Sequence, residues 1–224
     1  MEDTDLQIVL DFISGKIREE TFREAWKSNE KIGEWLENLV DLKSELNPEW
    51  TNIPYNEYRM AIHKHYQGSL SRFLSASEDF KLQHPNRPKW LDIGWYFEPI
   101  AAIVVVAFPE MKPTDYYANE KDFYLSCMGN YIGGLEVESA ANNLLANYPA
   151  EMGKRKRKAE AKKAIKEYFH IEGTKYPRWV QEPEWPMGTN SPMAFCSQKR
   201  EGERVSFTFQ DVDTQEIKVV EQFY

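Results

Sequence analysis

Cysteine and histidine are scarce in this sequence, and their scarcity narrows the chemistry that the chain can support. There are two cysteines and four histidines among 224 residues. Cys127 and Cys196 lie far apart without a CxxC spacing, so we expect two ordinary, buried thiols in a reducing compartment. His63 and His65 form the closest histidine pair, but residues two apart on a helix point about 200° apart and cannot bind one metal ion together.

Long apolar runs are also lacking. The longest, from Ile100 to Phe108, has nine residues, whereas a membrane-spanning helix needs roughly 20. Residues 1–5 are polar and acidic, without the basic region that opens a secretory signal. We therefore expect a cytoplasmic protein with no membrane partner.

Recognisable catalytic and cofactor motifs are absent from the sequence as well. No serine stands in GxSxG, and neither cysteine has the local signature of a nucleophile. Asp211 and Asp213 resemble the start of a calcium loop, but the glycine and the closing glutamate of such a loop are missing, so we interpret both as turn formers. We expect no catalytic residue, no metal site and no cofactor. A cysteine paired with a distant histidine is the alternative that the sequence leaves open.

Basic residues are fewer than acidic ones, and they are unevenly distributed along the chain. The chain has 28 basic and 36 acidic residues, a net charge of −8, although the stretch 154–166 alone carries eight basic residues and one acid. An acidic surface disfavours nucleic acid and favours cationic partners, although many proteins are this acidic for solubility alone. The basic run from Lys154 to Lys158 is either a nucleic-acid or localisation patch or the solvated start of a helix. We favour the solvated start, although cations are unfavourable at that helix end.

Helical periodicity dominates most of the chain. Apolar residues recur at steps of three and four residues in several segments, which predicts amphipathic helices over 6–13, 22–40, 58–73, 137–148 and 161–168, with 22–40 forming either one helix or two, the second starting near Ile32. The stretch 90–108 is apolar on every side at its centre. Its length and the pair Ala101-Ala102 favour a central helix over a buried strand.

The composition changes at Gly173. Prolines crowd the segment 177–192, and beyond it apolar residues alternate with polar ones, with Ile217, Val219 and Phe223 on one side of the last segment. The sequence thus predicts an α+β fold that is predominantly α. It has a helical, bundle-like body (1–172) and a connector with a three-stranded antiparallel β-meander (173–224), packed on that body because so small a sheet is rarely stable alone.

The segment 179–192 combines prolines with Trp179 and Trp185. Proline fixes the backbone, and tryptophan supplies rigid contact area at small entropic cost. The segment is either a binding surface, where Glu182 and Glu184 offer charge to a basic partner, or a rigid connector whose tryptophans cap the core. The connector is the simpler interpretation.

Three segments resemble bacterial immunity proteins. Residues 12–17 (FISGKI), with the residues up to Trp26, resemble the opening of small helical immunity proteins of colicin-type and contact-dependent toxins. Residues 94–102 (GWYFEPIAA) and 115–117 (DYY) are similar to the central helix and following loop of the PoNi immunity proteins, helical neutralisers of DNase toxins. Residues 177–224 resemble the tryptophan-proline and β-meander tails of other immunity-type proteins.

The resemblance implies an immunity protein that binds a cognate bacterial toxin, a basic nuclease domain, and covers its active or substrate-binding site. The residues that we expect at this interface are Glu182, Glu184, Asp211 and Asp213 as charges and Trp185 as anchor. The alternative is a non-catalytic interaction or adaptor protein of another bacterial system. An enzyme of unrecognised type is the third hypothesis.

Overall fold

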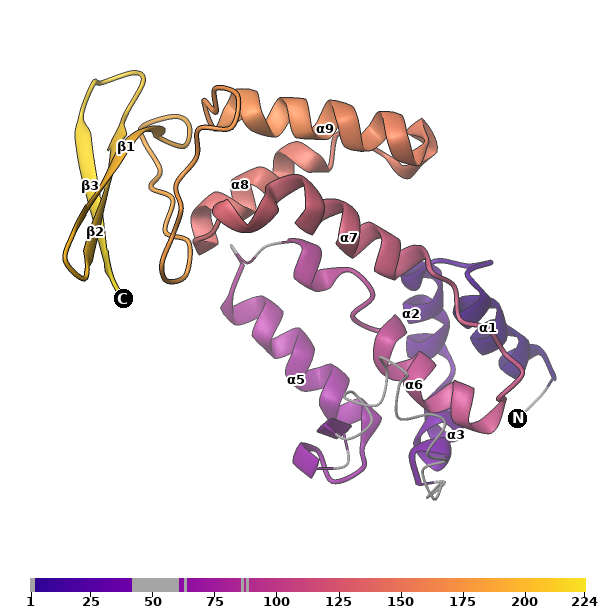
Figure 1. The fold of residues 1–224 in the computed structure, drawn as a ribbon. Helices are drawn as coiled ribbons and strands as arrows, with labels where there is room; N and C mark the ends of the chain where they lie inside the picture. Colours follow the sequence, from indigo (N-terminus) through magenta and orange to yellow (C-terminus); the bar gives the residue numbers. More distant parts are fainter. Residues whose placement is uncertain (1–2, 42–60, 63, 86, 88) are drawn as a thin grey trace. The chain divides into compact units, whose positions relative to one another are not determined.

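The computed structural model describes the chain except for residues 1–2, 42–60, 63, 86 and 88 (Figure 1). The chain forms two compact units. Unit 1 comprises residues 1–85 and 93–119, and unit 2 comprises residues 86–92 and 120–224. The fold class is α+β and predominantly α, as the sequence predicts, and the sheet belongs to unit 2.

Unit 1 is built around a helix that is buried on all sides. Its described elements are α1 (Asp3–Ser14), α2 (Glu19–Ser28), α3 (Glu30–Asp41), α5 (Leu70–Gln83), α6 (Phe97–Ala107) and the start of α7 (Tyr116–Met128). Every side chain from Ile100 to Val105 in α6 is buried, and α1 and α3 pack on this helix. The predicted central helix is therefore confirmed for Phe97–Ala107, with Pro99 in its first turn, where proline is tolerated. The start of the predicted stretch 90–108 is not part of it, because Lys89–Asp92 form the separate 3-10 helix η2 and Gly94 has a φ of 73°.

One predicted helix of unit 1 is interrupted. The first part of the predicted segment 58–73 lies outside the described residues. In the described part, Gln67 and Gly68 have φ values of 56° and 78°, a left-handed conformation that ends a helix. Ser69 then caps α5, because its side chain accepts a hydrogen bond from the backbone N–H of Arg72 at 3.2 Å. A continuous helix through these residues is a wrong prediction.

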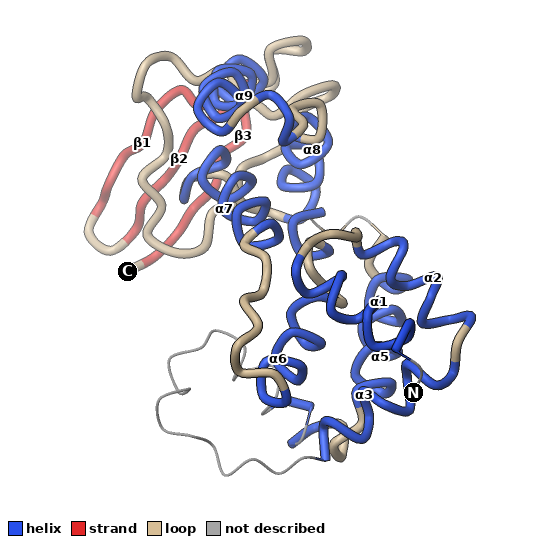
Figure 2. Tube along the Cα trace, turned by 90° about the vertical axis from the view of Figure 1, so that its right-hand side faces the viewer, coloured by secondary structure: helices blue, strands red, loops and turns tan. Residues whose placement is uncertain are grey.

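Unit 2 combines helices with the C-terminal sheet. Its elements are η2 (Lys89–Asp92), the rest of α7, η3 (Gly129–Tyr131), α8 (Leu135–Leu145), η4 (Ala150–Met152), α9 (Lys154–Tyr168), β1 (Ala194–Glu201), β2 (Arg204–Gln210) and β3 (Ile217–Phe223). The helices α8 and α9 lie side by side, and the strands form an antiparallel meander in the order β1-β2-β3 (Figures 1 and 2). The sequence predicts a boundary at residue 173, whereas unit 2 holds residues on both sides of it.

The sheet has one apolar, buried face. Val205, Phe207 and Phe209 of β2 are at most 3% exposed. On β3, Ile217 and Phe223 share one side, as the alternation predicts, but that side faces solvent. The buried residue of β3 is the polar Gln222, whose side chain binds the backbone of residues 180–182.

Candidate functional site

The segment with the two C-terminal tryptophans packs into unit 2 through their rings. The indole N–H of Trp179 donates to the carbonyl of Tyr131 at 2.8 Å, and its ring centroid lies 4.5 Å from that of Phe207. The indole N–H of Trp185 donates to the carbonyl of Met193 at 2.8 Å. Both indole N–H groups therefore have partners inside the unit; the ring of Trp185 is buried and that of Trp179 is half-buried.

The tryptophan that the sequence analysis expects at the partner interface has no free surface. Trp185 is 3% exposed, with Phe169 at 5.1 Å and Phe209 at 5.5 Å between ring centroids. An interface anchor needs exposed area in the free protein. In this structure both tryptophans pack as the connector interpretation describes: Phe169 and Phe209 contact Trp185, and Phe207 and Phe209 contact Trp179.

The backbone of the same segment is held by one buried side chain. Gln222 is 0% exposed. Its Oε1 accepts hydrogen bonds from the backbone N–H groups of Val180 and Gln181 at 3.1 and 3.0 Å, and its Nε2 donates to the carbonyl of Glu182 at 2.7 Å. One carboxamide thus satisfies three backbone groups in a row and fixes the path of residues 180–182.

A second point of attachment lies at the other side of Glu182. The backbone N–H of Trp185 donates to the carbonyl of Gly133 at 3.1 Å. A Cβ atom added to Gly133 would lie 2.6 Å from Cβ and 2.8 Å from the carbonyl oxygen of Pro183. Only glycine permits this approach, so residues 180–185 are held from both ends against the body of unit 2.

The carboxylates of this held segment point to solvent. Glu182 and Glu184 are exposed, and Glu138 of α8 is close to Glu182. Burial raises the pKa of Glu138, and the nearby charge of Glu182 raises it further. We call Glu138, Glu182 and Glu184 the acidic surface. The charge of Glu182 disfavours the ionised form of Glu138, and a nearby cation would offset that effect.

The two aspartates named by the sequence analysis have different environments. Asp211 is 3% exposed, and its carboxylate accepts hydrogen bonds from N and Oγ1 of Thr189 at 2.7 and 2.8 Å and from the backbone N–H of Asp213 at 2.8 Å. These bonds hold the pKa of Asp211 well below its usual range. Asp211 is thus a turn former without free surface, whereas Asp213 is exposed and accepts a hydrogen bond from Asn190 at 2.9 Å.

The cysteines and histidines named by the sequence analysis have different environments. Cys127 is buried, which raises the pKa of its thiol and disfavours the nucleophilic thiolate. Cys196 is half-buried, His65 is exposed, and His63 lies outside the described residues. Among the residues that the structure describes, no group of three or more histidine, cysteine, aspartate or glutamate side chains could hold a metal ion.

None of the helices in the described part of the chain is both long and apolar enough to cross a bilayer.

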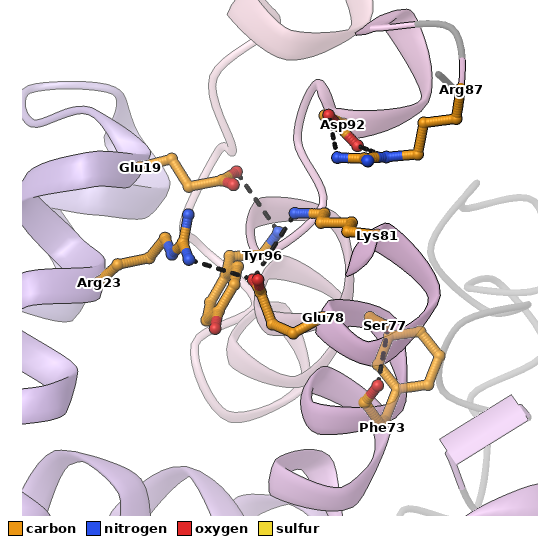
Figure 3. A network of polar contacts seen from close by, with 9 residues as sticks. All are labelled: Glu19, Arg23, Phe73, Ser77, Glu78, Lys81, Arg87, Asp92 and Tyr96. Atoms are coloured by element: carbon orange, nitrogen blue, oxygen red, sulfur yellow. Dashed lines mark hydrogen bonds and ion pairs between the residues drawn. The ribbon is translucent and has the colours of Figure 1, made fainter. Parts of the chain in front are cut away.

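Unit 1 contains a polar network that joins α2, α5 and α6 (Figure 3). The carboxylate of Glu19 accepts a hydrogen bond from the backbone N–H of Tyr96 at 3.3 Å, at the start of α6. Glu78 binds Arg23 at 3.1 Å and Lys81 at 3.6 Å. Burial raises the pKa of Glu19 to about 7. A carboxyl group titrating near neutrality is also typical of catalytic acids, but this one caps a helix and ties elements together, so we interpret it as structural.

The basic run at the start of α9 contains one residue of a different kind. Arg157 is 6% exposed and binds both carboxylate oxygens of Glu120, at 2.5 and 2.9 Å. Lys154, Arg155 and Lys156 are exposed. The interpretation of the basic run as the solvated start of a helix therefore applies to Lys154, Arg155 and Lys156. Arg157 instead belongs to the interior of unit 2.

No protein-family description, curated protein or solved structure matches this chain. What the fold defines is a class: a predominantly helical α+β protein whose C-terminal meander shares one compact unit with helices.

Replacing Gln222 by leucine should loosen the held segment. Leucine keeps much of the volume but leaves two N–H groups and one carbonyl without their partner, which we expect to lower the free energy of unfolding of unit 2 by about 1–3 kcal/mol. Amide hydrogen exchange at Val180 and Gln181 should become faster than in the wild type. Gln181→Leu makes the same change at an exposed position of the segment and should cost less than about 0.5 kcal/mol. Unchanged exchange in Gln222→Leu would contradict the role of this side chain.

Proposed function

We propose that this chain is an immunity-type protein that neutralises a basic bacterial toxin by binding it through the acidic surface. The observation that carries the proposal is the held segment: Glu182 and Glu184 are exposed on a backbone fixed by Gln222 on one side and by Gly133 on the other. A neutraliser must bind tightly and stoichiometrically, and a surface that is already ordered in the free protein loses little entropy on binding.

Charge complementarity supports a cationic partner. The chain carries a net charge of −8, and within the acidic surface the charge of Glu182 raises the pKa of Glu138. Opposite charges on two partners accelerate their encounter and exclude wrong partners. A toxin that acts on nucleic acid binds phosphates with lysine and arginine. A rigid row of carboxylates therefore fits such a site and would cover it without any chemistry on either protein.

Protection of cells is the direct test. The chain and the product of the neighbouring gene are expressed together, and growth is compared with that of cells expressing the neighbour alone. We expect the neighbour to be toxic alone and harmless with this chain. Growth arrest in both strains, with both proteins present at comparable levels, would reject the proposal.

Charge reversal maps the interface. Glu182→Lys combined with Glu184→Lys should weaken toxin binding at low salt by about 100-fold or more, because each attraction becomes a repulsion. Stability should change little, since both side chains are exposed. The control reverses two exposed carboxylates of the sheet turns, Glu203→Lys with Glu216→Lys, at equal net charge. Titration calorimetry at two salt concentrations measures all three proteins, and equal weakening by both pairs would remove the acidic surface as the site.

An adaptor function is the second candidate, and one observation favours it. Arg155, Lys162 and Lys166 recur at steps of seven and four residues on the exposed side of α9 and form a basic stripe. Unit 2 thus carries surfaces of both signs, which suits a protein that joins two partners. Two results together would favour the adaptor over the neutraliser. The neighbouring gene would encode no toxic product, and the chain would bind an acidic protein in a way that Lys162→Glu abolishes.

A further inference from the structure

The outer edge of β3 is open, and the hydrogen bonds of the sheet fix which residues face it. The backbone N–H of Tyr224 donates to the carbonyl of Glu203 at 3.0 Å, and that of Asp211 donates to Glu216 at 2.9 Å. In an antiparallel ladder the residues of a strand alternate between facing the neighbour and facing away. The even-numbered residues of β3 therefore bond to β2, and the backbone groups of the odd-numbered ones point outward. Within the described chain, β3 pairs only with β2 (Figure 2).

The outward-facing residues also carry the exposed apolar side chains of the strand. Ile217, Val219 and Phe223 are 54%, 52% and 52% exposed. Their register partners on β2 are polar: Gln210, Thr208 and Arg204, respectively. The apolar row is thus one strand wide and lies at the very edge of the sheet. Apolar residues that face each other on neighbouring strands stabilise a sheet. The apolar residues of this row have no such apolar partner on β2.

The one charged residue of the row is compensated within the sheet. The carboxylate of Glu221 lies 3.3 Å from Arg204 and accepts a hydrogen bond from Ser206 at 3.3 Å, and both partners belong to β2. A charge on an edge strand ordinarily prevents pairing with another strand. Here the carboxylate of Glu221 is held toward β2, and the other charged residue of the strand, Lys218, belongs to the even-numbered residues and so lies on the opposite side of β3.

We propose that β3 pairs with β3 of a second copy of the chain, antiparallel, about a twofold axis at Val220. Ile217 then lies opposite Phe223 of the partner subunit, and Val219 lies opposite Glu221 of the partner subunit. The outward-pointing backbone N–H and C=O groups of β3 then form hydrogen bonds with those of β3 in the second copy. The two meanders thereby join into one continuous sheet. This inference goes beyond the proposed function and needs no toxin.

The sequence of the strand selects this axis and this occupant. An axis at Glu221 would place two glutamates directly opposite each other, which is destabilising. An axis at Val219 would pair Ile217 with Glu221 and leave Phe223 without a partner. Only the axis at Val220 pairs the two large apolar residues and keeps like charges apart. A strand that complements itself in this way fits the isologous interface of a twofold dimer.

The mass of the protein in solution tests the inference. We expect the wild type to sediment as a dimer at tens of micromolar. Val219→Pro should shift it to monomer by weakening association at least about 10-fold, because the N–H of Val219 points outward and proline there removes no hydrogen bond of the chain's own sheet. Val219→Thr keeps the N–H and the branched shape and should remain dimeric. A wild type that is still monomeric at about 100 µM, a concentration at which even a weak dimer would form, would overturn the proposal. A folded, dimeric Val219→Pro would overturn it as well.

Two further variants keep the test decisive if the proline variant fails to fold. Phe223→Glu should also be monomeric, since it places a charge opposite Ile217 of the partner subunit; a folded, dimeric form would overturn the proposal. Val220→Cys in a Cys196→Ser background reports the axis, because a residue on the axis meets its own copy. Mild oxidation should link the two chains through this cysteine and leave Ser206→Cys in the same background unlinked. Linking at Ser206→Cys alone would overturn the register.

Discussion

Replacing Arg157 by methionine is expected to lower the free energy of unfolding of unit 2 by about 3–5 kcal/mol, since it leaves a buried carboxylate without its partner. Methionine keeps the length of the side chain and its packing, so the cost comes from the lost charge and hydrogen bonds. Chemical denaturation, followed by hydrogen exchange at the amides of α9, measures the effect.

The geometry around Arg157 explains so large a cost. Its guanidinium binds both oxygens of Glu120, its Nε donates to the carbonyl of Tyr148 at 2.7 Å, and its Cζ lies 3.6 Å from the ring centroid of Phe123. The side chains of Arg157 and Glu120 are 8% and 14% exposed. Water therefore replaces none of these partners readily, and lysine, which lacks the planar fork, should restore only part of the stability.

Two comparisons make the prediction specific. Arg157→Met combined with Glu120→Leu should recover most of the lost stability, because a buried ion pair often exchanges for apolar residues without loss. Lys163→Met removes a cation of the same helix that is 78% exposed and pairs with Glu167 at 3.6 Å, and it should cost less than about 0.5 kcal/mol. An Arg157→Met protein as stable as Lys163→Met would show that the pair contributes nothing.

The elements that the sequence predicts well are those with long, regular periodicity. The centre of the run that becomes α6 is apolar on all sides, and burial of residues 100–105 is the physical consequence. The alternation after residue 193 suffices to predict the meander, although only the central strand β2 buries its apolar side chains on one face. The break at Gly68 was harder to predict, since an apolar stripe can cross a left-handed turn without a change in its spacing.

The candidate site was predicted only in part, because residue type does not report burial. Glu182 and Glu184 are exposed as expected, but Trp185 and Asp211 are internal. Tryptophan suits interfaces and cores equally. An aspartate in a turn binds its own backbone as readily as a partner.

The three polar residues that the sequence analysis missed differ in how visible they were. Arg157 stands four residues before Ala161 and eight before Ile165, on the apolar side of α9, so its position signalled burial. Gln222 stands on the same side of β3 as the apolar Val220, which is half-buried. Glu19 gives no signal at all: its partner, Tyr96, is 77 positions away in the chain, and only the tertiary fold of unit 1 brings them together.

Glu19 makes the stability of unit 1 depend on pH in the direction opposite to an ordinary carboxylate. Burial raises its pKa to about 7 from the usual 4.5, and the hydrogen bond from Tyr96 and the charges of Lys81 and Arg23 offset only part of this. Between these two pH values the folded state holds a proton that the unfolded state has released, so stability falls as pH rises. The loss from this group is complete above the folded pKa and amounts to about 3 kcal/mol.

Glu19→Gln should remove this loss, because glutamine keeps an acceptor for the N–H of Tyr96 and never ionises. The free energies of unfolding of the variant and the wild type are compared by denaturation at several pH values from 4.5 to 8. Their difference should move in favour of the variant by up to about 3 kcal/mol over that interval, while other titrating groups cancel. Glu20→Gln changes the exposed neighbour and should shift the difference by less than about 0.5 kcal/mol. A flat difference for Glu19→Gln would mean that water or a cation reaches the carboxylate of Glu19 in solution and that this end of α6 is more open than its hydrogen bonds indicate.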